Sequence, residues 1–186
     1  LLSTLSGHLG LPRSIHWAEG DHELVSAGDD GAVFTWNVRT RERVHEHVAR
    51  GRQYCAIALD GSPEQGGLAI AAAGSSSSQA AEDCFIRHIA EGAIVSEAMG
   101  EHRVTQLAIS AVDGYLVAGM ASGAVRLYNW PLTPSSVPVA ALSVHVAPVR
   151  HLALSSKSRR LYCASDDGSI SVLDMPVPEG RHRASS

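Results

Sequence analysis

Four side chains that can share hydrogen bonds stand at a spacing that recurs later in the sequence. They are His8, Ser26, Asp30 and Trp36. An imidazole, a hydroxyl, a carboxylate and an indole N–H can join into one buried hydrogen-bonded relay that gives every polar group a partner. A buried aspartate without a partner would cost on the order of 1–3 kcal/mol, so the complete set predicts a structural network rather than a reactive centre.

The same spacing recurs with half of the set replaced. His145 and Asp167 repeat the interval between the first histidine and aspartate, whereas Cys163 and Leu173 take the places of the serine and the tryptophan. We therefore expect one complete and one partial hydrogen-bond network. The residues expected to take part are His8, Ser26, Asp30, Trp36, His145 and Asp167.

Two other kinds of cluster could hold a metal ion, but both have too few ligands. The Asp-Asp-Gly segments at 29–31 and 166–168 lack the further, regularly spaced oxygen ligands of a calcium loop, so they indicate tight turns. His45 and His47 flank Glu46 and would share one face of a strand, but two histidines do not make a metal site. We expect no bound metal.

The sequence holds no motif of a catalytic centre. It has no phosphate-binding G-x-x-x-x-G-K, no G-x-S-x-G and no H-E-x-x-H. Cys55, Cys84 and Cys163 lack C-x-x-C spacing, which favours buried thiols in a reducing compartment over disulfides or zinc ligands. The serine run at 75–78 is typical of a flexible loop, with phosphorylation as the alternative. We expect a protein that is not an enzyme, with no catalytic residue and no cofactor.

Composition limits the classes of partner. The 186 residues are 45% hydrophobic and 18% charged, which allows a buried core, and the net charge of −4 argues against binding nucleic acid or an anionic membrane. No apolar run approaches the roughly 20 residues of a membrane span. We expect protein partners, with no nucleic acid, membrane or small-molecule substrate among them.

The elements that must position the polar sets are short strands. Three apolar, partly alternating runs separated by Gly, Asp and Ser turns recur in four segments, at about residues 6–48, 49–98, 99–142 and 143–175. A further short run follows the third one, at 43–48, 93–98 and 137–142. Four strands per repeat are typical of β-propeller blades. Insertions at 60–67 and 75–82 interrupt the second segment and are expected to leave the sheet as loops.

The fold expected is all-β: four consecutive four-stranded blades of a larger ring of about seven. Residues 1–5 are expected to form the outer strand of a preceding blade, and the chain is expected to be an excerpt of a longer one. No outer strand clearly follows Asp174, because Pro176 and Pro178 cannot donate to a ladder. Residues 176–186 are expected to form a linker or tail that leaves the propeller.

Both edges of such a propeller carry candidate partner-binding residues. The upper rim is the edge where the inner strand of each blade begins, and its equivalent positions hold Arg13, Cys55, Thr105 and Arg150. The lower rim is the opposite edge, and its turns hold the basic residues Arg39, Arg41, Arg43, Lys157, Arg159 and Arg160. A solvated turn is the simpler interpretation of the basic residues, and a contact for acidic partners is the alternative.

Several motifs in the sequence resemble those of a known protein family. Gly7-His8, Asp30-Gly31 and Trp36-Asn37 have the pattern of the WD-repeat β-propellers. A closer resemblance, which extends over Asp83-Cys84 and the stretch from Gly119 to Leu132, is to WD-repeat proteins associated with cilia and flagella. It implies that residues 1–175 are the C-terminal part of a propeller.

The resemblance also implies a function. It implies a non-catalytic protein–protein interaction scaffold of the axoneme, part of the cytoskeleton of a cilium or flagellum. Such a scaffold sits on doublet microtubules and helps to place or regulate inner dynein arms. Its expected partners are inner dynein arm or regulatory components, with tubulin as a further candidate. The alternative is a cytosolic WD-repeat adaptor, such as a ubiquitin-ligase substrate receptor or a trafficking scaffold.

Overall fold

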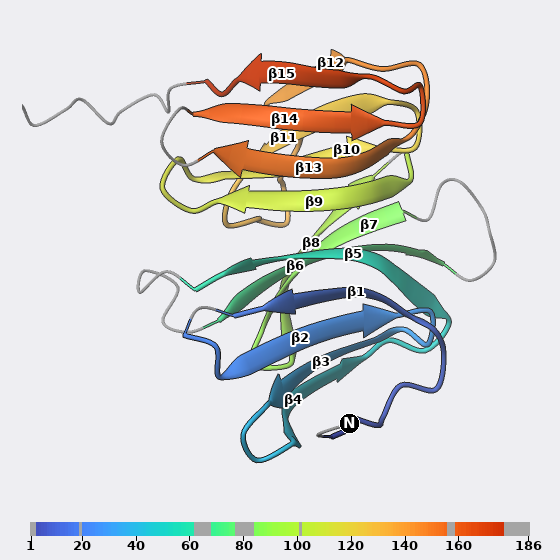
Figure 1. The fold of residues 1–186 in the computed structure, drawn as a ribbon, viewed down its shortest axis with the longest axis vertical. Coiled ribbons are helices and arrows are strands. Elements are labelled where there is room, and N and C mark those ends of the chain that lie inside the picture. Colours follow the sequence, from blue (N-terminus) through green and yellow to red (C-terminus); the bar gives the residue numbers. More distant parts are fainter. Residues whose placement is uncertain are drawn as a thin grey trace, which may run out of the picture.

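The computed structural model describes residues 3–18, 20–61, 68–76, 84–100, 102–155 and 159–176 (Figure 1). Fifteen strands in these ranges form four antiparallel sheets, in each of which strands adjacent in sequence pair as hairpins. None of these ranges contains a helix long and apolar enough to cross a lipid bilayer. The all-β class expected from the alternating runs is confirmed.

Three sheets have four strands and the last has three. The first sheet contains β1 (Pro12–Trp17), β2 (Glu23–Gly28), β3 (Ala32–Asn37) and β4 (Glu42–Val48). The second contains β5 (Arg52–Asp60), β6 (Ala69–Ser76), β7 (Cys84–Ala90) and β8 (Ala93–Gly100). The third contains β9 (Val104–Ser110), β10 (Tyr115–Met120), β11 (Ala124–Asn129) and β12 (Ala140–Ser143). The fourth contains β13 (Val149–Ser155), β14 (Arg160–Ser165) and β15 (Ile170–Asp174).

The four sheets follow one another like blades around an axis. Their first strands β1, β5, β9 and β13 contact one another in that order, and Figure 1 shows them side by side along the long axis of the molecule. The upper rim, where β1, β9 and β13 begin, lies at the right of Figure 1. This arrangement of inner strands is that of consecutive propeller blades.

Strand ends differ from the sequence expectation in several places, and the outer strand of the third blade, expected at 137–142, is β12 at Ala140–Ser143. Residues 3–5 belong to no strand, so the outer strand expected at 1–5 is wrong for the part that is described. Leu5 instead packs against Phe34 and Trp36 of the first sheet. Asp60 and Ser75 are not loop residues, because they pair with Ala69 and with Gln53 in the ladder between β5 and β6. Ser76 pairs with Arg52 in the same ladder, and residues 62–67 and 77–82 of the two insertions lie outside the described residues.

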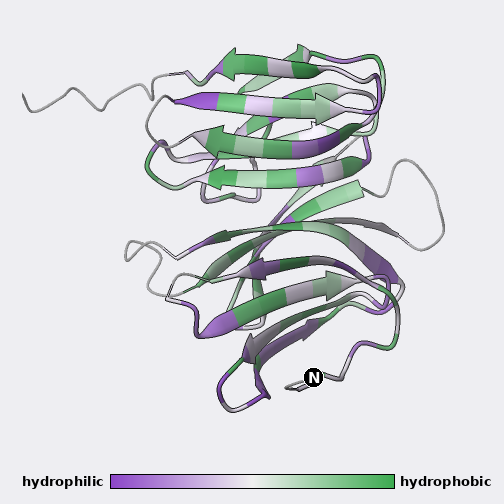
Figure 2. Ribbon diagram, viewed as in Figure 1, coloured by the Kyte–Doolittle hydropathy of each residue, from purple (hydrophilic) through white to green (hydrophobic). Residues whose placement is uncertain are grey.

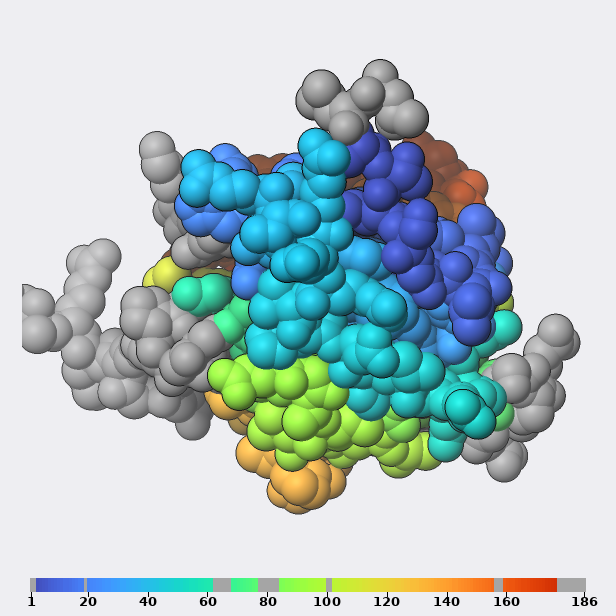
Figure 3. All heavy atoms as spheres, turned by 90° about the horizontal axis from the view of Figure 1, so that it is seen from below, coloured from blue at the N-terminus to red at the C-terminus, as the bar shows by residue number. Residues whose placement is uncertain are grey.

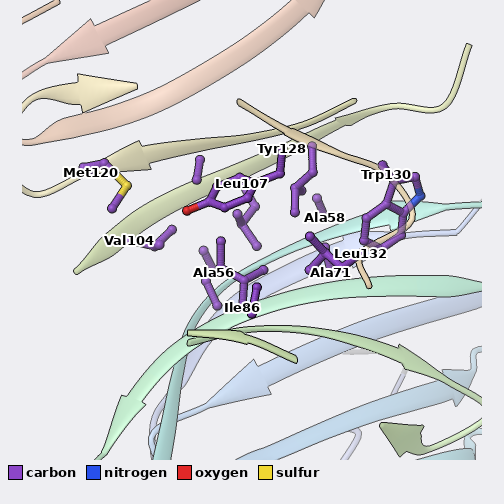
Figure 4. Close-up of a cluster of buried hydrophobic side chains, with 14 of the residues drawn as sticks. Ala56, Ala58, Ala71, Ile86, Val104, Leu107, Met120, Tyr128, Trp130 and Leu132 are labelled. Atoms are coloured by element: carbon purple, nitrogen blue, oxygen red, sulfur yellow. The ribbon is translucent and has the colours of Figure 1, made fainter. Parts of the chain in front are cut away.

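The core lies between the sheets. The largest cluster joins the second and third sheets, and Figure 4 shows its side chains meeting between them. The second sheet contributes mainly alanines, such as Ala56, Ala58 and Ala71, whereas the third contributes larger side chains, such as Tyr128 and Trp130. Small side chains opposite large ones let two sheets approach closely without a void.

The outward face of the first sheet carries exposed apolar side chains, whereas the matching side chains of the fourth sheet are partly buried. Ile15 and Trp17 are 63% and 56% exposed. Leu152 and Leu154 stand at the same repeat positions, and both pack against the core cluster between the third and fourth sheets. Figure 3 views this end of the arc, with the N-terminal segment (dark blue) and β4 (light blue) at the surface.

The outward face of the fourth sheet shows the reverse. Ile170 and Val172 are 72% and 53% exposed, whereas Val33 and Thr35, at the same repeat positions of the first sheet, are buried, and Val33 packs against the second sheet. Figure 2 shows hydrophobic residues along β13, β14 and β15. Each blade therefore has two faces built for packing, and in the described chain the first and fourth sheets each use one.

A glycine in the turn after the second strand lets the next blade approach. Gly31 and Gly123 have φ of +73° and +84°, and a Cβ on either would lie 2.2 Å from a carbonyl oxygen, that of Ala49 or His145. The Ala49 and His145 N–H groups donate to the carbonyls of these glycines at 2.8 and 3.1 Å. Gly168 has φ of +83°, but open space surrounds the position of its Cβ.

These turns give a matched pair of substitutions. Gly123→Ala is expected to lower the free energy of unfolding by about 3 kcal/mol, because left-handed strain and a backbone clash add. Gly168→Ala adds the same strain without the clash and should cost about 1–2 kcal/mol. Chemical denaturation of both variants measures the difference. Equal losses would contradict the contact between Gly123 and the chain at His145.

A buried histidine should make stability depend on pH. His88 on β7 is 6% exposed, its ring lies 4.8 Å from that of Trp130, and within the described residues neither ring nitrogen has a hydrogen-bond partner. Burial lowers the pKa of His88 from its ordinary 6.5, although the charge of Asp60 opposes the shift. The unfolded chain therefore binds this proton more readily than the folded chain does.

Protonation of His88 should accordingly leave the unfolding free energy unaffected above pH 6.5. It should lower the unfolding free energy as the pH drops from 6.5 toward the lowered pKa of His88. His88→Phe keeps a ring against Trp130 and removes the titrating group, so its unfolding free energy should fall less over this range than that of the unmodified chain. Urea titrations at several pH values test this. The exposed His22→Phe serves as control and should leave the pH dependence unchanged.

Candidate functional site

The four polar residues of the first blade form one connected network. His8 Nδ1 lies 3.0 and 3.1 Å from the two carboxylate oxygens of Asp30. His8 Nε2 lies 2.8 Å from Ser26 Oγ, to which the Trp36 indole N–H also donates at 2.8 Å. Because a carboxylate only accepts, His8 Nδ1–H donates to Asp30, and the Ser26 hydroxyl can donate to Nε2 while it accepts from Trp36. Every group then has a partner with the imidazole neutral.

Asp30 anchors the network to the backbone. Leu9 N–H donates to its carboxylate at 2.7 Å and Ala32 N–H at 3.2 Å. Burial alone would raise the pKa of Asp30, but these two bonds and the His8 ring outweigh it and lower the pKa. The aspartate therefore ties the segment that enters the blade to the turn between β2 and β3.

The fourth blade repeats the anchor but not the full network. His145 Nδ1 lies 3.0 Å from Asp167 Oδ2. The Ser169 hydroxyl donates to Asp167 at 2.6 Å, and this bond, with the Ser169 and Val146 amides and His145, lowers the pKa of Asp167 to about 2 despite desolvation. Cys163 is fully buried in the place of the serine, and His145 Nε2 has no hydrogen-bond partner in the described chain.

A second buried polar cluster was not found from the sequence. The Arg87 guanidinium on β7 donates to the Tyr54 hydroxyl at 2.7 Å and to Glu97, and it lies 4.3 Å over the Phe85 ring. His47 on β4 lies 2.9 Å from the same hydroxyl, which joins the first and second blades. The signal available was an arginine between the apolar residues of β7, a type that is seldom buried without partners.

The four residues expected at the upper rim do line one hollow there. The hollow has a volume of about 220 Å³. Its walls are formed by Arg13, Asp29, Gln53, Tyr54, Cys55, Ser75, Arg103, Val104, Thr105 and Arg150. The repeat pattern did not predict Arg103 at this site, because Arg103 lies two residues before the position equivalent to Arg13.

The two arginines of this set are held by neighbouring aspartates. Arg13 donates through Nε and Nη2 to Asp29, with Nη2 2.6 Å from Oδ2. Arg150 Nη2 lies 2.5 Å from Asp166 Oδ2 in the equivalent pair. Each hydrogen-bonded aspartate raises the pKa of its arginine. Both pairs are exposed, so they orient the guanidinium groups more than they stabilise the fold.

Cys55 and Thr105 instead bond within the protein. The Cys55 thiol donates to the Val104 carbonyl at 3.1 Å, and burial raises its pKa to about 11, so it is a protonated and unreactive group. The Thr105 hydroxyl donates to the Val149 carbonyl of the next blade. None of the three cysteines forms a disulfide, and two of them are buried.

The basic residues of the lower rim do not gather in one patch. Arg43 pairs with Glu46, and Arg159 pairs with Asp113 of the third blade. The arginines of the first and fourth blades lie at opposite ends of the arc (Figure 1). Arg39 and Arg41 lie exposed in the turn before β4, Arg160 pairs with Asp174, and Lys157 lies outside the described residues. Among described side chains no group of three or more His, Cys, Asp or Glu is placed to hold a metal ion.

The arc of hairpin sheets, the turn glycines and the His–Asp anchors define a class of protein. The family model of the WD domain, G-beta repeat, matches residues 1–37 and 136–174, the two blades with the anchors. The chain thus contains WD repeats in its first and last blades and has the fold of consecutive β-propeller blades, as the resemblance implied.

Individual proteins are also similar to the chain. The chain is 28% identical to cilia- and flagella-associated protein 57 of Mus musculus over 181 residues, or 97% of this chain, and it is related to that protein. The match spans only 14% of the length of that relative. Guanine nucleotide-binding protein subunit beta-1 of Caenorhabditis briggsae is 39% identical over 61 residues, which cover 32% of this chain and 18% of that protein.

Solved structures agree on the fold. A chain of the Mitotic Checkpoint Complex crystal structure superposes with a TM-score of 0.76 at 20% identity, over 92% of this chain and 51% of that one. The computationally designed Ika4 protein gives a TM-score of 0.69 at 17% identity, over 93% of this chain and 96% of that one. At such identities the likeness supports the propeller fold alone.

Removal of the Ser26 hydroxyl, the central group of the complete network, should destabilise the fold. Ser26→Ala removes the partner of both His8 Nε2 and the Trp36 indole, so it should lower the unfolding free energy by about 2–3 kcal/mol. The reciprocal substitution Cys163→Ser offers His145 Nε2 the hydrogen bond that it lacks. It should lower the unfolding free energy far less than Ser26→Ala does, or raise it. Thermal and urea unfolding of both variants measure this, and a neutral Ser26→Ala would contradict the network.

Proposed function

We propose that the chain is part of a non-catalytic protein–protein interaction scaffold of the ciliary or flagellar axoneme. Its role is to help to place or regulate inner dynein arms on doublet microtubules, and thereby ciliary motility. The observation that carries the proposal is the match to a cilia- and flagella-associated protein over 97% of the chain. A similarity that includes the degenerate second and third blades is more informative than one confined to the repeat motif.

The structure supports a binding role over a catalytic one. The polar groups buried in the first blade are saturated by one another, and the Cys55 thiol, whose pKa is raised, is protonated. Arg13 and Arg150, on the inner strands β1 and β13, instead lie exposed at the upper rim. Exposed side chains held on a rigid scaffold suit recognition of another protein.

A cytosolic WD-repeat adaptor is the second candidate. It is favoured by the match to a guanine nucleotide-binding protein beta subunit, which is higher in identity but covers only 61 residues. In this alternative the repeat motif carries the similarity, and the partners are those of a ubiquitin ligase or a trafficking scaffold.

Localisation separates the two candidates. The protein, tagged at its own gene in a ciliated or flagellated cell, should remain on the axoneme after detergent removes the membrane. Deletion of the gene should reduce the occupancy of inner dynein arms in electron tomograms of the axoneme. A detergent-soluble cytosolic signal, with unchanged dynein arms in the deletion, would contradict the axonemal function and favour the adaptor.

A further inference from the structure

The hollow at the upper rim holds an excess of positive charge in a chain that is negative overall. Three arginines and one aspartate line it, although the net charge of the chain is −4. Asp29 neutralises Arg13, and Asp166 pairs with Arg150 beside the hollow. Within the described ranges no carboxylate pairs with Arg103. One positive charge in the hollow is therefore left unmatched by the carboxylates that the structure describes.

The repeat explains why the charge is unmatched. In the first and fourth blades an arginine early in the inner strand pairs with the first aspartate of the Asp-Asp-Gly turn. The corresponding positions of the third blade hold Thr105 and Ala121, so this blade lacks both members of the pair. Arg103 is an additional arginine at the start of that blade, and the turn opposite it offers no carboxylate.

The neighbouring aspartates also orient the other two guanidinium groups. Asp29 takes the Nε and Nη2 groups of Arg13, and Asp166 takes those of Arg150. In the described contacts the Nη1 groups of both arginines make no hydrogen bond. A guanidinium fixed on one edge loses little entropy when its other edge binds, and its planar donors match the geometry of a carboxylate.

We propose that this hollow binds a carboxylate side chain from an acidic segment of a partner protein, with Arg103 as the main contact and Arg13 and Arg150 as flanking donors. The inference rests on the proposed binding role of the chain. A volume of about 220 Å³ holds one or two side chains and is below the usual size of a small-molecule site. Nucleic acid would need phosphate contacts along an extended basic path, which the negative chain does not offer.

The test uses a fluorescent eight-residue peptide with four central glutamates and the purified chain. Fluorescence anisotropy should show saturable binding that weakens as salt rises. Arg103→Gln should weaken binding about three- to tenfold. Arg39→Gln makes the same charge change on the opposite rim and should leave binding unchanged. Thermal melts of both variants verify that they fold.

Each other outcome overturns the proposal. If the glutamine version of the peptide binds equally well, or Arg103→Gln and Arg39→Gln have equal effects, a carboxylate is not recognised in this hollow. If a phosphoserine version binds while the glutamate version does not, the ligand is a phosphorylated segment and the carboxylate assignment is wrong.

The result can be separated from the test of function. If the protein localises to the axoneme but does not bind the glutamate peptide, the proposed function stands and the proposed binding site is wrong. A cytosolic protein with Arg103-dependent peptide binding would keep the site and lose the axonemal function.

Discussion

The upper rim depends on one hydrogen bond in each of the first and fourth blades. It joins the histidine that precedes the inner strand to an aspartate in the turn between the second and third strands. His8 and Asp30 are 22 positions apart, and their bond holds the entering segment against the turn between β2 and β3. His145 and Asp167 do the same in the fourth blade. The inner strand begins within five residues of each histidine, so the anchor also sets where that strand starts.

The rim residues are placed as a consequence. Arg13 follows the first histidine by five positions, and Asp29 directly precedes the anchored Asp30, so one contact positions both members of their ion pair. The equivalent pair in the fourth blade is built in the same way. Without the anchor, two exposed long side chains would gain little from pairing, because a surface ion pair contributes at most about 1 kcal/mol.

The two middle blades keep their place through other contacts. The second blade packs alanines against the large side chains of the third, and its Arg87 satisfies Tyr54 and Glu97 inside the sheet. Asp60 accepts the Trp130 indole N–H at 2.8 Å across the same boundary. Blades that lack the repeat motif can thus remain in register because both of their faces are covered.

The sequence allowed prediction of what the repeat encodes. The strand pattern, the His–Asp anchor and the rim position shared by Arg13 and Arg150 each recur at the same spacing in the first and fourth blades. The contacts between blades leave no such trace, because Arg87 with Tyr54 and Asp60 with Trp130 are partners only once the sheets have stacked. Ladder pairing also kept Asp60 within a strand, although its neighbours have the composition of a turn.

A double-mutant cycle on His8 and Asp30 tests the central claim most directly. His8→Ala, Asp30→Ala and the double variant are each unfolded in urea, and the coupling free energy is taken from the four unfolding free energies. A buried hydrogen bond to a carboxylate predicts a coupling of about 1.5–3 kcal/mol that favours the pair. A coupling near zero would show that the two side chains act independently, and it would contradict an upper rim built on this contact.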